Sequence, residues 1–186
     1  FAADHLNHKP DIICMSKGIT GGVMALGATS ATAHVYNAFI SDDKSKMFLH
    51  GHSYTGNPLA CVVAKASLDL LQEDDTWTAI KRISIQHHQF VSNVMNHPYV
   101  EDARTLGVVL AVSVKSGSEK SYFNYLRDRL YNFFIHRKIL LRPLGNVIYI
   151  MPPYCITDEE LNMVYAAISD LLDELQNNVR AKQNFF

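Results

Sequence analysis

Short apolar runs alternate along this chain with longer stretches whose apolar residues repeat at helical spacing, and this alternation limits the chain to an α/β architecture. The run "PDIICMS", residues 10–16, predicts a buried parallel strand. A second buried strand is predicted near residues 23–30, followed by a short helix near 31–40. Hydrophobic residues make up 48% of the 186, so the chain can bury a substantial core.

The clearest helix start lies at Asn57 and Pro58. Asparagine can cap a helix, and proline at the first helical position loses no hydrogen bond. Five apolar residues that follow repeat at helical spacing and are predicted to face inward: Leu59, Val62, Val63, Ala66 and Leu70. A second helical stretch runs from about residue 75 to 96. We expect it to link two domains, because the pattern changes after it.

From about residue 100 the predicted order is strand, helix, strand, strand, helix. "GVVLAVSVK" predicts the first strand, and "ILLRP" and "VIYIMPP" predict a hairpin around the turn "LGN". The helix over 121–137 is predicted to bury Phe123, Leu126, Leu130 and Phe133 or Phe134. Thr157 and Glu160 predict a capping box before the last helix. The inner face of that helix is predicted to contain Leu161, Val164, Tyr165, Ile168, Leu172 and Leu175.

The net charge and the cysteines limit which binding partners and compartments the sequence favours. A net charge of -1 and a pI near 6.8 provide no field that would attract nucleic acid or an acidic membrane, and no apolar run approaches the ~18 residues of a membrane span. The three cysteines, Cys14, Cys61 and Cys155, are scattered, which argues against disulfides and zinc and favours the reducing cytoplasm. The histidines also lack ligand spacing, so no metal is expected. Because the chain begins with Phe1, we expect it to start inside a longer protein.

Lys17 follows the first apolar run directly and is flanked by Gly18, Gly21 and Gly22. A lysine at the end of a buried strand must pair or lose its proton, and a neutral amine can form a Schiff base with an aldehyde. The glycines would leave room for a flat ring close to the backbone. The other interpretation is a strand-end lysine whose ammonium extends into solvent.

The loop "HGHSYTGNP", residues 50–58, combines Gly51, two hydroxyl residues (Ser53 and Thr55) and the start of a helix. Turn N–H groups, hydroxyls and a helix N-terminus together can bind a phosphate. Alternatively, the loop only caps the helix, although Gly51 and Ser53 are not needed for that. The neighbouring histidines, His50 and His52, are expected to be hydrogen-bonding spacers rather than proton shuttles.

Arg142 lies in the apolar stretch "ILLRPLGNVIYIMPP" and cannot deprotonate, so a buried guanidinium there needs an anion. A carboxylate of the protein or the carboxylate of a substrate could serve. Tyr149 follows on the returning strand and could lie near Arg142, or it could be an ordinary core tyrosine with a satisfied hydroxyl.

Together, "PDIICMSKGITGG", "HGHSYTGNPLAC" and "RPLGNVIYIMPPY" resemble, in this order and spacing, the class III pyridoxal-phosphate aminotransferases. The last stretch resembles the branch that transfers an amino group from S-adenosylmethionine to 8-amino-7-oxononanoate, giving 7,8-diaminononanoate in biotin biosynthesis. The resemblance implies the C-terminal part of a fold type I enzyme that works as a cytoplasmic homodimer with shared active sites. It implies the end of the large, mostly parallel-sheet domain over 1–75, a linking helix over 76–97 and a small α+β domain over 98–186.

The resemblance also implies roles for individual residues. Lys17 matches the lysine that binds pyridoxal 5'-phosphate as an imine and contacts the substrate, and Gly51 matches a glycine of the substrate pocket. His52 and Ser53 match the pair that binds the cofactor phosphate across the dimer interface. Arg142 matches the arginine that binds the substrate carboxylate, and Tyr149 matches a pocket tyrosine. The resemblance implies no metal ligand among these residues.

This chain departs from the family in two respects. The family often has proline and threonine where this chain has His52 and Ser53; the serine retains the hydroxyl. The aspartate that pairs with the pyridine nitrogen, and the aromatic residue stacked on the ring, lie upstream of the position of Phe1 in such enzymes. We therefore expect these 186 residues alone to be inactive. A relative that uses lysine or another ω-amine as donor, and a non-catalytic fragment, remain alternatives; an unrelated binding protein would require three motifs to coincide.

Overall fold

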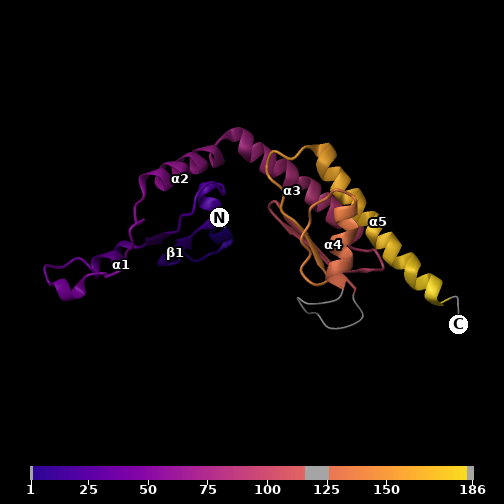
Figure 1. Cartoon of the computed structure of the whole chain (residues 1–186), viewed down its shortest axis with the longest axis horizontal. Helices are drawn as coiled ribbons and strands as arrows, with labels where there is room; N and C mark the ends of the chain where they lie inside the picture. Colours follow the sequence, from indigo (N-terminus) through magenta and orange to yellow (C-terminus); the bar gives the residue numbers. More distant parts are fainter. Residues whose placement is uncertain (1, 116–125, 184–186) are drawn as a thin grey trace. The chain divides into compact units, whose positions relative to one another are not determined.

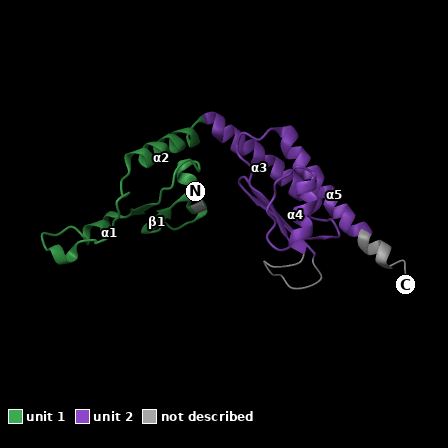
Figure 2. Cartoon of the chain, in the orientation of Figure 1, with its two compact units in different colours: residues 1–73 green, residues 74–186 purple. Residues whose placement is uncertain are grey.

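The computed structural model describes residues 2–115 and 126–183. The chain divides into two compact units, unit 1 over residues 1–73 and unit 2 over 74–186 (Figure 2). Among the described residues, no helix is both long enough and apolar enough to cross a membrane. Because each unit has its own internal packing, each is described separately.

Unit 1 is built around a two-stranded sheet and a helix that lies against the turn between the strands (Figure 1). Its described elements are η1 (Ala2–His5), β1 (Ile12–Met15), η2 (Lys17–Thr20), β2 (Ala28–Ala31), α1 (Ala33–Asn37), η3 (Lys44–Lys46) and α2 (Pro58–Leu71). The strand predicted at 10–16 and the helix predicted in 31–40 are confirmed as β1 and α1.

The buried environment predicted for the first two strands is wrong within unit 1, where β2 begins only at Ala28 and is largely exposed. β1 pairs with β2 in an antiparallel register, from Ile12 opposite Ala31 to Met15 opposite Ala28. The connection between them contains only the 3-10 turn η2, and no crossover helix that a parallel pair would require. Ile12 and Ile13 are exposed, because no second layer of unit 1 covers them.

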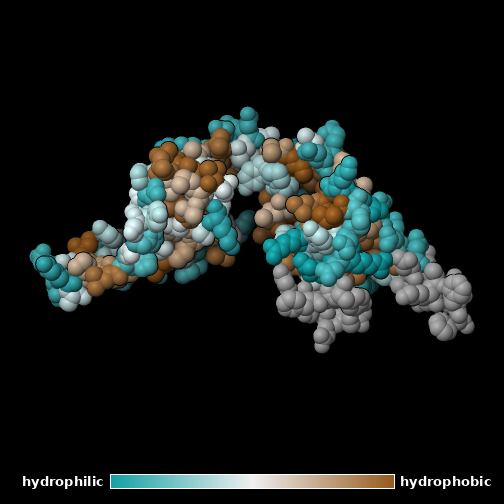
Figure 3. Space-filling view, in the orientation of Figure 1, coloured by the Kyte–Doolittle hydropathy of each residue, from teal (hydrophilic) through white to brown (hydrophobic). Residues whose placement is uncertain are grey.

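The predicted cap of α2 is confirmed, but its predicted inner face is wrong. Asn57 Oδ1 accepts hydrogen bonds from the N–H groups of Leu59 and Ala60 at 3.0 and 3.4 Å. The buried residues are Ala60 and Ala64, whereas Leu59 and Val62 are about two-thirds exposed, at 68% and 66%. Apolar residues surround most of this helix, so periodicity could not identify the buried side. The small alanines let η2 approach, and Figure 3 shows the remaining apolar surface over α2.

Unit 2 packs three helices with one antiparallel sheet of order β3-β4-β5 (Figure 1). Its described elements are α3 (Asp74–Val94), β3 (Val100–Leu106), β4 (Val109–Val114), α4 (Leu126–His136), β5 (Val147–Ile150) and α5 (Asp158–Gln183). α3 corresponds to the predicted linking helix, and it packs against β3 and β4 within this unit. Its residues Ile83, Phe90 and Val94 belong to the core.

The predicted core of unit 2 is largely confirmed. On α4, Leu126, Leu130, Phe133 and Phe134 are buried, whereas Phe123 lies outside the described residues. On α5, most of the predicted inner residues are buried, and Val164 is partly buried against the same core. Sheet residues that alternate along β4 and β5 complete this core: Leu110, Val112, Val114, Ile148 and Ile150.

One strand of unit 2 was not predicted, and one strand prediction is wrong. β3 was not predicted, since "VEDARTL" carries charged residues on its exposed face and shows little apolar character. The segment 139–143 forms no strand; only Leu144 bridges to Val147, and β5 pairs with β4. Pro143 has no N–H to donate to a ladder, which explains why the pairing stops there.

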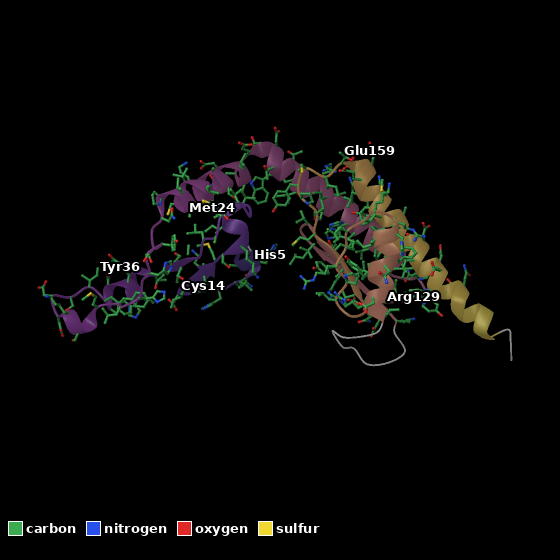
Figure 4. All side chains as sticks on the ribbon, in the orientation of Figure 1. His5, Cys14, Met24, Tyr36, Arg129 and Glu159 are labelled. Atoms are coloured by element: carbon green, nitrogen blue, oxygen red, sulfur yellow. The ribbon has the colours of Figure 1, made fainter. Side chains whose placement is uncertain are left out.

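Polar contacts fix the start of α5. The predicted capping box is confirmed: Thr157 Oγ1 accepts from the N–H of Glu160 at 3.2 Å, and Glu160 Oε2 accepts from the N–H of Thr157 at 2.9 Å. Arg82 of α3 donates to Asp158, whose pKa is held below its usual value by hydrogen bonds from Gln86 and Arg82. Farther along, Arg129 of α4 (labelled in Figure 4) donates to Glu174 of α5 at 3.0 Å.

Candidate functional site

Lys17 occupies the first position of η2 with a backbone that lysine disfavours. Its φ is +54°, in the left-handed region, directly after the extended Ser16. For a residue with a side chain this conformation costs about 1–2 kcal/mol. Such strain persists only where the surroundings impose it, and observed strain of this kind is found preferentially at functional sites.

The turn that follows Lys17 supplies that constraint. Thr20 is buried, and its hydroxyl donates to the carbonyl of Met24 (labelled in Figure 4) at 2.5 Å. Gly21 ends η2 with a φ of +61°, and a side chain there would lie 3.6 Å from Ser67 Oγ of α2. That distance is an ordinary contact, so Gly21 is explained by its left-handed backbone conformation.

The side chain of Lys17 is exposed, so of the two interpretations the structure agrees with the lysine that extends into solvent. The reason is that the strand before it is uncovered within unit 1. Among the described residues, no carboxylate forms an ion pair with the Lys17 ammonium. A side chain at Gly18 or Gly22 would meet no atom within 4 Å, which agrees with the predicted room for a flat group.

The loop before α2 is held by its own hydrogen bonds. The N–H of His52 donates to Thr55 Oγ1 at 2.9 Å, and the N–H of Tyr54 donates to His52 Nδ1 at 3.1 Å. The carbonyl of His52 accepts from the N–H of Thr55 at 2.9 Å. The His52 ring thus supports the loop, which leaves its Nε2 for any external contact.

Part of the predicted phosphate site is therefore used internally. The first N–H groups of α2 are satisfied by Asn57, and the N–H of His52 by Thr55. Within the described part of the chain, the hydroxyl and N–H of Ser53 have no partner. A hydrogen-bonded loop with free donors on Ser53 fits an anion, whereas a side chain at Gly51 would make only an ordinary contact with Thr55 at 3.8 Å.

Arg142 is exposed, which corrects the prediction of a guanidinium buried in an apolar hairpin. The physical reason is that exposure alternates along 139–143: Ile139 and Pro143 are buried, whereas Leu140 and Arg142 are exposed. Two anions were considered for Arg142, a carboxylate of the protein and one of a substrate. Among the described residues, no carboxylate of the protein forms an ion pair with Arg142. An exposed arginine without such a partner is available to an external carboxylate.

Tyr149 lies on β5 opposite Ala111 and is half-buried. No hydrogen bond joins it to Arg142 in the part of unit 2 that the structure describes. The predicted residues thus form two groups: Lys17, Gly51, His52 and Ser53 in unit 1, and Arg142 and Tyr149 in unit 2.

Two residues that support these groups were not predicted. Thr20 fixes the turn after Lys17, and Asn146 is a buried asparagine directly before β5. The turn "LGN" marked Asn146 as a turn residue, but no local pattern indicated that its side chain is buried. Its burial follows from the packing of the turn on the end of β4.

Comparison with known proteins places these observations in a family. The description "Aminotransferase class-III" matches residues 1–172. The chain is similar to proteins named adenosylmethionine-8-amino-7-oxononanoate aminotransferase, with 42% identity over 175 residues to that of Synechococcus elongatus and 38% over 185 residues to that of Helicobacter pylori. These matches cover 94% and 95% of this chain.

A solved structure of the same name, from Methanocaldococcus jannaschii, matches with a TM-score of 0.76 and 32% identity over 87% of this chain and 39% of that one. The chain spans 41% of the length of the relatives from Synechococcus elongatus and Helicobacter pylori. The fold is therefore that of a portion of these enzymes.

Proposed function

This chain belongs to the class III aminotransferase family, and from that premise we propose that the protein transfers an amino group from S-adenosylmethionine to 8-amino-7-oxononanoate. The product would be 7,8-diaminononanoate, an intermediate of biotin biosynthesis. The observation that carries this proposal is the identity of 42% and 38% to relatives that bear this activity in their names. The stretch "RPLGNVIYIMPPY", which contains both Arg142 and Tyr149, supports the same branch of the family.

Pyridoxal 5'-phosphate is the proposed cofactor, and the described residues fit it. Open space beside Gly18 and Gly22 would accommodate the ring of one cofactor. The free donors of Ser53, with His52 Nε2 in the same loop, would bind the phosphate of the partner subunit's cofactor. When bound, it supplies an electron sink for the substrate carbon.

Lys17 is the proposed catalytic residue. Its exposed amine is accessible to an aldehyde, and in its neutral form Nζ is a nucleophile that can bind the cofactor covalently. Once the amino donor has displaced it, Nζ can accept the proton that leaves the reacting carbon of the donor and later return one to the acceptor. The strained backbone supports this role, because it fixes where the long side chain starts.

Arg142 would bind the carboxylate of 8-amino-7-oxononanoate, and Tyr149 would contact the same substrate. A guanidinium binds a carboxylate through two parallel N–H donors, which fixes orientation as well as affinity. Arg142 is suited to this role because no described carboxylate competes for it. Gly51 would let the substrate approach the loop closely.

We also propose a homodimer with shared active sites. Support comes from an exposed apolar segment around α1 and the following loop, in which Tyr36, Phe48 and Leu49 are at least 64% exposed. The rings of Phe39 and Phe48 contact each other in a tilted arrangement, with centroids 5.3 Å apart, so this segment packs on itself while it remains exposed. Tyr36 is labelled in Figure 4. In such a dimer, His52 and Ser53 would serve the partner's cofactor. Three exposed, free thiols support a cytoplasmic location.

The test is a donor assay with the full-length protein, loaded with cofactor. We expect product from 8-amino-7-oxononanoate with S-adenosylmethionine and none with lysine. Lys17→Ala should abolish turnover, and Ser53→Ala should weaken cofactor binding about tenfold, the value of one charge-assisted hydrogen bond. Lys65→Ala, which removes an exposed lysine of α2, is the matched control and should behave as wild type. Activity with lysine but not with S-adenosylmethionine would refute the assigned donor.

A further inference from the structure

The turn between Arg142 and β5 is unusually well fixed. Leu144 and Val147 exchange two backbone hydrogen bonds, each 2.9 Å long, around the two-residue turn of Gly145 and Asn146. Gly145 has a φ of +59°, as the first position of such a hairpin turn requires. The turn therefore adopts one conformation, although the segment before it is not part of the sheet.

Asn146 attaches this turn to the neighbouring strand. Its side chain is buried, and Nδ2 donates to the carbonyl of Val114 at 2.7 Å. Its own carbonyl accepts from the N–H of Val114 at 2.9 Å. Asn146 thus satisfies both backbone groups of the last residue of β4, beyond the point where the β4–β5 ladder ends at Ser113 and Val147.

The other end of the segment is fixed as well. Two residues after the end of α4, Lys138 has a left-handed φ of +61°, and the N–H of Ile139 donates to the carbonyl of Phe134 at 3.0 Å. Ile139 is buried in the core. Arg142 lies between this anchor and Pro143, which restricts the residue before it to an extended backbone. Its backbone is therefore held from both sides while its side chain is exposed.

We propose that Asn146 is a positioning residue for the substrate carboxylate: by attaching the turn to Val114, it sets where the Arg142 guanidinium meets its ligand. The inference rests on the proposed role of Arg142. Asn146 does not touch the ligand; it acts through the short segment that joins it to Arg142. Without the amide, the turn keeps its own two bonds to Val147 but loses its side-chain attachment to β4, so Arg142 shifts with it.

The experiment measures steady-state kinetics of the cofactor-loaded full-length protein with two acceptors, 8-amino-7-oxononanoate and its methyl ester. The ester lacks the negative charge that Arg142 binds. Variants are Asn146→Ala, Asn146→Ser, Arg142→Ala and the double variant of Arg142→Ala with Asn146→Ala. Serine is accepted at this turn position but is too short to reach Val114, which provides a milder variant if alanine prevents folding. Asn132→Ala, an exposed asparagine of α4, is the matched control.

We expect Asn146→Ala and Asn146→Ser to raise KM for the acid about tenfold, within the roughly hundredfold that a displacement of about 1 Å can cost. KM for the ester should not change, and kcat should change little. In the double variant, KM for the acid should equal that of Arg142→Ala, because Asn146 has no effect once the guanidinium is gone.

Two results would overturn the inference: equal effects on acid and ester, which indicate general loss of structure, or additive effects in the double variant. If Arg142→Ala raises KM for the acid and both Asn146 variants do not, only the inference about Asn146 fails. If Arg142→Ala leaves KM for the acid unchanged, the proposed role of Arg142 fails, and the inference fails with it.

Discussion

Lys17 combines a strained backbone with an exposed side chain, and neither property is needed for folding. The left-handed φ of +54° is normal for glycine and unfavourable for lysine. Glycine occupies comparable conformations at Gly21 and Gly22 in the same turn. Lysine at this position is therefore best explained by its amine.

The strained backbone at Lys17 predicts that replacement by glycine increases stability and abolishes activity. Lys17→Gly should raise the free energy of unfolding of the cofactor-free protein by about 1 kcal/mol, because glycine removes the left-handed penalty. Lys17→Ala retains the Cβ and should leave that free energy nearly unchanged. Both variants should lose transamination. Urea denaturation measures the difference; if glycine and alanine are equally stable, the backbone at this position is not strained.

At the scale of elements, local capping determines where helices begin. Asn57 satisfies two N–H groups of α2, and the Thr157–Glu160 box satisfies two at the start of α5. In α2 the cap has a further consequence, because it takes donors that would otherwise be available to an anion. For binding an anion, the loop before α2 therefore has the donors of Ser53 rather than the first N–H groups of the helix.

Replacement of this cap is the second prediction. Asn57→Ala should lower the free energy of unfolding by about 1 kcal/mol, since two N–H groups lose their acceptor. Asn57→Asp places a carboxylate oxygen where the amide oxygen was and should retain most of the stability that the alanine variant loses. Chemical denaturation of the cofactor-free protein distinguishes the two variants. Equal destabilisation by both would show that the side-chain oxygen does not cap α2.

At the scale of the whole molecule, a buried polar contact in unit 2 joins two helices to the turn between β3 and β4. His87 of α3 is fully buried; its Nε2 lies 3.1 Å from the carbonyl of Val108, and its Nδ1 lies 2.6 Å from the hydroxyl of Tyr165 on α5. A carbonyl can only accept, so Nε2 carries the proton and Nδ1 accepts from Tyr165. Phe90 stacks on the Tyr165 ring at 4.5 Å.

This contact predicts acid sensitivity. Burial lowers the pKa of His87 below its ordinary 6.5 and raises the pKa of Tyr165, so the neutral pair is the stable one. A histidine with a lowered pKa binds fewer protons folded than unfolded, so its stabilisation is complete above pH 6.5 and is lost as the pH falls through the folded pKa. We expect the free energy of unfolding to decrease from about pH 7.5 to about pH 5.5.

The matched variants are His87→Gln and His88→Gln. His87→Gln should cost about 1–3 kcal/mol at neutral pH and should flatten the acid dependence, because glutamine does not titrate. His88 is exposed, and its replacement should leave the dependence unchanged. Urea denaturation at several pH values measures both; an equally steep dependence in His87→Gln would assign the acid sensitivity to other groups.

The sequence by itself determined the features that depend on neighbouring residues. The cap at Asn57, the box at Thr157, the tight turn at "LGN" and the inner faces of α4 and α5 follow from side chains within a few positions of one another. The motifs around Lys17 and Arg142 likewise indicated the family, because each is a short segment with a particular composition.

Only the tertiary structure decided which of these side chains are covered. Arg142 was predicted to be buried and is exposed, and the sequence left open whether Lys17 is buried or exposed. α2 buries its alanines instead of its larger residues, and Asn146 is buried without any local signal. β3 was missed because its charged residues are exposed and it becomes a strand by pairing with β4 at the edge of the sheet. Burial depends on which distant segments pack against a residue, and periodicity within one segment carries no information about them.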